Sequence, residues 1–171
     1  MSNMYLHTVD TYSRILSSML KWFDKAIAFA EAKNFDVDTL ITARLAPDMF
    51  PFAWQVKSVC DCAMGQPALL CGKVWSKHEI DETSFVGLRR QIETALCYLA
   101  NFKPEDFDGC EERRVMLPVG PDKWIVGGEF VDQIANPNFF FHVAMAYAIL
   151  RHNGIDLGKR DFLGSVNVQQ G

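Results

Sequence analysis

The chain has 171 residues, of which 49% are hydrophobic and 22% charged, as expected of one globular domain with a buried core. Its net charge of −4 provides no basic surface for nucleic acid or anionic lipid. The first residues do not show the basic start and following apolar run of a signal peptide. The longest nearly apolar stretch, 139–150, is shorter than the ~20 residues of a membrane span. We therefore expect a single domain over residues 1–171 that binds neither nucleic acid nor membranes.

The cysteines indicate a reducing compartment. An odd number of cysteines without secretion signals predicts free thiols and a cytoplasmic protein. The five are Cys60, Cys62, Cys71, Cys97 and Cys110. Cys60 and Cys62 are separated by about 200° on a helix, so the two cannot chelate one metal ion, and we expect all five to be small buried apolar groups.

The first long segment has apolar residues at alternating steps of four and three, which predicts one helix face. This helix should run from about residue 4 to Lys33 and end near Asn34. A short helix over Asp38–Arg44 should follow, capped by Asp36 or Asp38.

Two more helices follow in the middle of the chain. Asp48 is expected to cap the first of them, which carries Pro51 in its first turn and ends near Cys71, with Gly72 just beyond. A polar loop over 76–81 separates it from a helix capped by Thr83 or Ser84, whose apolar stripe spans 85–99.

The pattern changes to strict alternation at Val115, Leu117 and Val119 and again at Trp124 and Val126. Two alternating runs separated by a turn predict a β-hairpin, in which Pro118 suits an exposed edge.

The last long helix should be capped by Asn136, carry Pro137 at its first position and stop at Gly154. Residues 139–150 are apolar all round, so other elements should cover this helix on most sides. The tail should pack back on the bundle through Leu157, Phe162 and Leu163. The sequence therefore predicts an all-α four-helix bundle with a small β-hairpin inserted before the last long helix.

His142 is the candidate site residue with the most unusual setting, because it is the strongly polar residue of the apolar 139–150 stretch. A buried imidazole needs a hydrogen-bond partner. Two interpretations follow: a core histidine bonded to a neighbouring helix, or a ligand or acid–base group that faces a pocket. His152 is ten residues away, about 15 Å and 80° around an ideal helix, so the two cannot bind the same metal ion.

Three sequence segments carry a family resemblance: RLAPDMFPFAWQV, GCEERRVMLPVG and NPNFFFHVAMAYAILRHNG with the following GKRDFLG. Together they resemble an uncharacterised branch of the DinB-like superfamily, and the similarity covers nearly the whole chain. The resemblance implies a four-helix bundle that is often dimeric. Better-known members bind a divalent metal through one histidine of the second helix and a His-x-x-x-His pair of the last, and some are thiol-dependent transferases or isomerases.

This chain departs from that metal pattern. The matching position of the second helix is Gln55, and the last helix keeps one histidine of the pair, whether His142 or His152 is matched. We therefore expect no tightly bound divalent metal as cofactor, with His142 as the ligand if one binds.

A pocket remains possible where the bundle brings His142 near the start of the second helix. Its candidate residues are His142, Gln55, Asp48, Arg44, Trp54 and Tyr147. Arg44 and Asp48 have the alternative of a salt bridge that fastens the loop, and the two aromatic residues could equally be core.

Three functions are compatible with these features. The first is a small-molecule-binding bundle protein with a degenerate metal site. The second is a metal- or thiol-dependent enzyme of transferase or hydrolase type that uses a site around His142. The third is a purely structural homodimer. We also expect a homodimer from the resemblance and from apolar residues left exposed on the bundle.

Overall fold

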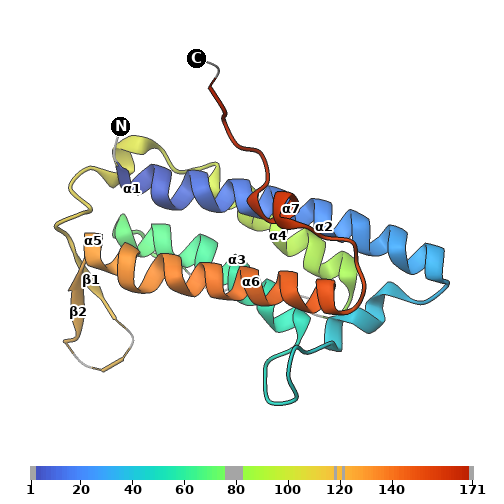
Figure 1. The fold of residues 1–171 in the computed structure, drawn as a ribbon. Helices are drawn as coiled ribbons and strands as arrows, with labels where there is room; N and C mark the ends of the chain where they lie inside the picture. Colours follow the sequence, from blue (N-terminus) through green and yellow to red (C-terminus); the bar gives the residue numbers. More distant parts are fainter. Residues whose placement is uncertain (1–2, 76–82, 118, 121, 170–171) are drawn as a thin grey trace.

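The structure is a computed structural model that describes residues 3–75, 83–117, 119–120 and 122–169. Four long helices form an elongated bundle, which confirms the predicted fold class (Figure 1). They are α2 (Thr11–Lys33), α3 (Phe52–Leu70), α4 (Phe85–Leu99) and α6 (Asn136–His152). α3 packs against both α4 and α6, and α2 packs against α4, so the apolar faces of all four helices meet in one core.

The N-terminal helix forms as predicted. α1 (Asn3–Tyr5) continues through a π-helical turn at Leu6–Asp10 into α2. Asn34 ends the helix in the left-handed conformation with φ 56°, which asparagine tolerates better than most residues. The predicted apolar face is buried from Val9 to Ala30, so its burial stabilises the bundle more than helix propensity does.

The predicted Asp48 cap of α3 is wrong. The residue in the cap position is Pro51, which has no side-chain acceptor, and Asp48 lies in an exposed turn before it. The backbone replaces the cap, because Phe52 N–H donates to the Ala43 carbonyl at 2.8 Å. The preceding 3₁₀ turn, Val37–Thr42, is capped by the Asp36 side chain, as expected.

The ends of the middle helices agree with the sequence. Gly72 has φ 66° just beyond α3, and the Ser84 hydroxyl accepts from Gly87 N–H at 3.0 Å to cap α4. The predicted polar loop over 76–81, with His78, lies outside the described residues.

The hairpin also forms. After a 3₁₀ turn at Pro104–Phe107, β1 (Arg114–Met116) pairs antiparallel with β2 (Trp124–Val126), with Val115 opposite Ile125. It projects from one end of the bundle (Figure 1). Pro118 lies outside the described residues.

The last long helix begins earlier than predicted. α5 (Gly127–Phe130) and a π-helical turn at Val131–Ala135 lead directly into α6. Asn136 is therefore not a cap, and its Oδ1 lies 3.0 Å from the Tyr12 hydroxyl instead. Residues 139–150 are buried or partly buried apart from Phe141, which is 52% exposed, so this helix is covered on most sides, as expected.

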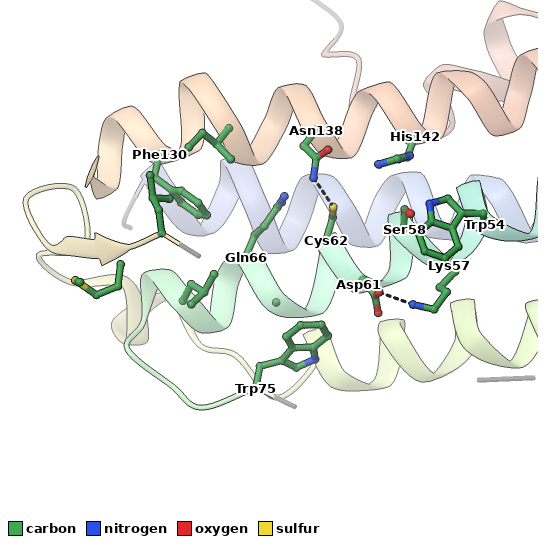
Figure 2. Close-up of a pocket in the computed structure, with 15 residues that line it drawn as sticks. Trp54, Lys57, Ser58, Asp61, Cys62, Gln66, Trp75, Phe130, Asn138 and His142 are labelled. Atoms are coloured by element: carbon green, nitrogen blue, oxygen red, sulfur yellow. Dashed lines mark hydrogen bonds and ion pairs between the residues drawn. The ribbon is translucent and has the colours of Figure 1, made fainter. Parts of the chain in front are cut away.

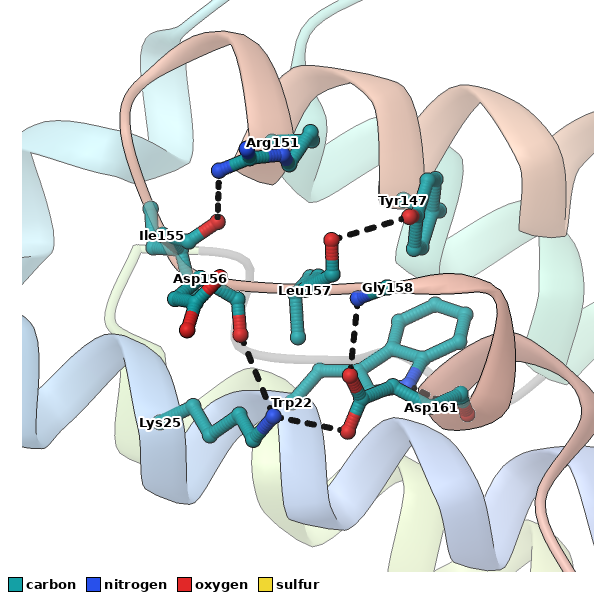
Figure 3. A network of polar contacts seen from close by, with 9 residues as sticks. All are labelled: Trp22, Lys25, Tyr147, Arg151, Ile155, Asp156, Leu157, Gly158 and Asp161. Atoms are coloured by element: carbon teal, nitrogen blue, oxygen red, sulfur yellow. Dashed lines mark hydrogen bonds and ion pairs between the residues drawn. The ribbon is translucent and has the colours of Figure 1, made fainter.

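The C-terminal segment crosses back over α2 and forms α7 (Lys159–Leu163), after which the chain continues without regular structure to residue 169 (Figure 1). Trp22 Nε1 donates to the Asp161 carbonyl at 3.0 Å, and the Tyr147 hydroxyl donates to the Leu157 carbonyl at 3.1 Å (Figure 3). Leu157 is buried and Phe162 packs on Trp22, as predicted, whereas Leu163 is 43% exposed.

None of the helices in the described part of the chain combines the length and the apolar character needed to cross a membrane. Apolar side chains exposed on the bundle include Phe50, Trp54 and Phe141. The homodimer stays a prediction.

Candidate functional site

A groove runs along the outward face of α3, with a cavity of about 330 Å³. Its floor is formed by α3 residues at steps of three or four: Trp54, Ser58, Asp61, Gly65 and Leu69. Helix α6 forms one wall, Trp75 from the segment after α3 forms the other, and the β-hairpin closes one end (Figure 2). We call this cavity the α3 groove.

His142 lies in the α6 wall, and its protonation is fixed by its neighbours. Gln55 Nε2 donates to the Phe50 carbonyl at 3.1 Å, so Gln55 Oε1 must face His142. His142 Nδ1 lies 2.8 Å from this oxygen and therefore carries the proton that it donates. Burial lowers the pKa of His142, which favours the neutral ring. Nε2 then keeps an unprotonated lone pair, with no hydrogen-bond partner among the described residues.

The structure brings three of the six candidate pocket residues together. Gln55 and His142 are in contact, and Trp54 lines the same groove, stacked on Phe50 with 4.7 Å between ring centroids. Trp54 is 38% exposed, so it belongs to the floor of the groove and not to the core.

The other three candidates lie elsewhere. Arg44 donates to the Met49 carbonyl and, within the described ranges, forms no ion pair with Asp48. Neither residue lines the groove. Tyr147 is on another side of α6, where its ring packs edge-on against Trp22 at 5.6 Å. Tyr147 is close to His142 in the sequence, but this closeness did not indicate that the two side chains face different sides of α6.

The groove also contains a charged pair that the sequence reasoning missed. Lys57 Nζ lies 2.9 Å from Asp61 Oδ2, and the two side chains are only 19% and 15% exposed. Among the residues that the structure describes, these are the two charged ones that line the groove, and their charges cancel. Their spacing of four residues on α3 was the signal that could have indicated them.

Amide side chains complete the polar lining. Asn138 Nδ2 lies 3.1 Å from Cys62 Sγ. The Tyr12 hydroxyl donates to Gln66 Oε1 at 2.8 Å, and burial raises the pKa of Tyr12 well above its usual range, so the phenol keeps its proton. Gln66 is only 6% exposed, and Figure 2 shows its amide nitrogen turned towards Asn138 and the α6 wall.

The groove does not fit the three-histidine metal site that the family resemblance implies. Gln55 uses its amide oxygen for His142 and its amide nitrogen for Phe50. Over the part of the chain that the structure describes, no group of three or more His, Cys, Asp or Glu side chains is placed to hold a metal ion. A tight site for a first-row metal needs about three such ligands.

The helix arrangement, with a groove between α3 and α6, defines a DinB-like four-helix bundle. The chain belongs to the family described as "Domain of unknown function (DUF1993)", whose sequence model matches residues 4–163.

A solved structure supports the same assignment. It is a DinB family member protein from Shewanella denitrificans, 38% identical in sequence, with a TM-score of 0.92. The similarity covers 98% of this chain and 96% of that chain. No match was found among curated proteins.

Proposed function

We propose that the chain is a small-molecule-binding protein whose α3 groove takes a planar, largely apolar molecule that donates a hydrogen bond to His142. The observation that carries this proposal is the Phe50–Gln55–His142 chain of hydrogen bonds. It holds the imidazole neutral and in one tautomer, with Nε2 available as an acceptor. Such an arrangement is preorganised to accept a hydrogen bond from a ligand.

The size and lining of the groove support this class of ligand. Its volume of about 330 Å³ is at the lower end of the range for small-molecule sites. Trp54 and Trp75 offer two flat aromatic surfaces, and Leu69 and Phe130 add apolar surface. Few polar groups within an apolar lining are typical of sites that bind organic molecules.

The charge of the site favours a neutral ligand. Lys57 and Asp61 already neutralise one another at 2.9 Å. An ionised ligand in the groove would compete with this largely buried pair, and separating such a pair is costly.

Isothermal titration calorimetry with β-naphthol, a planar bicycle with one O–H donor, tests the proposal. Its methyl ether has the same ring system and no donor. We expect saturable binding of β-naphthol and about 3- to 10-fold weaker binding of the ether, the effect of one hydrogen bond. His142→Phe should remove this difference. His152→Phe is the matched control, because His152 lies on the same helix, is exposed, and is not in the groove lining.

Absence of saturable β-naphthol binding up to about 1 mM would overturn the proposal. So would binding that His142→Phe and His152→Phe reduce equally, because the ligand would then not contact the groove histidine.

A further inference from the structure

Two cysteines that are far apart in the sequence lie next to each other at the hairpin end of the bundle. Cys71 directly follows α3, and Cys110 belongs to the loop before β1. Cys110 Sγ lies 3.0 Å from the carbonyl oxygen of Leu70, the residue bonded to Cys71. The two thiols also interact with one another through their side chains. The fold therefore brings together two thiols that local chain geometry does not.

Other contacts hold the two cysteine segments in place. Arg113 Nη1 donates to the same Leu70 carbonyl at 2.8 Å. Lys73 Nζ forms an ion pair with Asp106 Oδ2 at 2.9 Å. Each of these contacts joins the end of α3 to the loop before the hairpin. A bond between the two thiols would therefore need little movement of the backbone, which is the main requirement for a disulfide.

The two thiols differ in their access to solvent. Cys71 is partly exposed, whereas Cys110 is buried, so a dissolved oxidant reaches Cys71 first. Burial, and then the neighbouring Cys110 thiol, raise the pKa of Cys71 to about 12. Burial also raises the pKa of Cys110. Thiols of high pKa exchange slowly at neutral pH, but they are poor leaving groups, so a disulfide between them is also slow to be reduced.

We propose that Cys71 and Cys110 are a redox-responsive pair that closes into a disulfide and fastens the hairpin end of the bundle to α3. The oxidant is a low-molecular-weight disulfide such as oxidised glutathione. The Cys71 thiolate attacks one glutathione sulfur, forms a mixed disulfide and releases one glutathione thiolate. The Cys110 thiolate then attacks Cys71 Sγ and releases the second. The two released thiolates take up the two protons that the cysteines lose, so one oxidised glutathione becomes two reduced glutathiones.

The disulfide would act on two segments that lead into the groove lining. The segment after Cys71 continues to Trp75, and the loop after Cys110 continues to Met116 of β1. We therefore expect slower amide hydrogen exchange in β1 and β2 of the oxidised protein. Closing a loop of about 40 residues should also raise the melting temperature by roughly 5–10 °C. Neither effect requires a ligand in the groove.

The experiment uses a Cys97→Ser background, because Cys97 is exposed and would itself react with glutathione. The protein is incubated for a day with oxidised glutathione at about pH 9, where more thiol is ionised, and its intact mass is measured without reductant. We expect the loss of two hydrogen atoms, no retained glutathione and the higher melting temperature. Dithiothreitol should reverse all of these changes.

Variants in this background identify the two sulfur atoms. Adding Cys110→Ser should leave one glutathione on Cys71, because the second step is blocked. Adding Cys71→Ser should leave the chain unmodified, because Cys110 is buried. Cys62→Ala is the matched control: it removes another buried thiol, and the two hydrogen atoms should still be lost. Circular dichroism establishes folding, and Cys71→Ser, at the more exposed position, tests the bond if Cys110→Ser does not fold.

Three results would overturn the inference. The first is a Cys97→Ser protein that stays unoxidised after the incubation. The second is one that retains glutathione on Cys71 with Cys110 present. The third is loss of two hydrogen atoms in spite of Cys71→Ser or Cys110→Ser. Binding of β-naphthol by the reduced protein is measured separately, so the proposed function stands or falls independently.

Discussion

The Nδ1 atom of His142 lies 2.8 Å from Oε1 of Gln55, and this contact joins the two helices, α3 and α6, between which the groove lies. Gln55 can hold the ring in one tautomer because its own amide nitrogen is bonded to the Phe50 carbonyl at 3.1 Å. The contact thus links the start of α3 to the protonation state of a group in the groove wall.

This relationship predicts how stability depends on pH. Burial lowers the pKa of His142 below its unfolded value of about 6.5. Between the folded and the unfolded pKa of His142, the unfolded chain binds more protons than the folded chain. The contribution of the neutral His142 to stability is therefore complete above about pH 6.5 and is lost as the pH falls from there through the lower folded pKa. The denaturant midpoint should therefore be lower at pH 5 than at pH 7, and His142→Phe should reduce this difference. An equal pH dependence in both proteins would contradict this prediction.

The metal-binding capacity of the groove can be tested by adding ligands. Asn138 is one turn before His142, and both line the groove. Gln55→His with Asn138→His would place three histidines there, two of them four residues apart on one helix. We expect the double variant to bind zinc at least ~100-fold more tightly than the wild type, measured with a competing chelator. Asn138→His alone, with two ligands, is the control. Stoichiometric zinc in the wild type after gel filtration would show that the native donor set is sufficient.

The bundle could be predicted because its helices carry long apolar seams, whereas helix starts depended on contacts that the sequence does not display. Asp48 is a good cap residue, but the Ala43 carbonyl takes its place at the start of α3. Asn136 followed by Pro137 is typical of a helix start. Here the hairpin leads directly into the helix at Gly127, whose N–H donates to the Arg113 carbonyl at 2.9 Å.

The site was predictable in part for a similar reason. Gln55 and His142 were expected near one another, since both belong to regular helices whose packing the seams define. Trp75 was missed because it lies outside any regular element, and its position depends on contact with Gly65. Tyr147 was placed in the pocket although the rotation of α6 turns it towards Trp22.

Gly127 and Gly128 offer a matched pair for testing the start of α5. A Cβ on Gly127 would lie 1.9 Å from the Cys110 carbonyl oxygen, whereas on Gly128 the nearest atom is the Glu111 carbonyl oxygen at 3.6 Å, an ordinary contact. Gly127→Ala should therefore shift the backbone at the hairpin and lower the free energy of unfolding by about 2 kcal/mol or more, whereas Gly128→Ala should change it by less than about 1 kcal/mol. Urea denaturation measures both. Similar values for the two variants would mean that the loop containing Cys110 yields readily.

Tyr147 can be tested as a residue that fastens the C-terminal segment to α6 and does not line the groove. Its hydroxyl donates to the Leu157 carbonyl at 3.1 Å (Figure 3). Its ring packs against Trp22 and Phe162. Tyr147→Phe keeps the ring and removes the hydrogen bond, so we expect the free energy of unfolding to fall by about 0.5–1.5 kcal/mol. The affinity for β-naphthol should stay unchanged, because Tyr147 does not line the groove. Tyr5→Phe is the control: Tyr5 is half-buried against Phe107 and donates no hydrogen bond within the described residues, so its loss should cost less than about 0.5 kcal/mol. If Tyr147→Phe kept full stability and bound β-naphthol more weakly, Tyr147 would belong to the binding site, and its role in fastening the C-terminal segment would be contradicted.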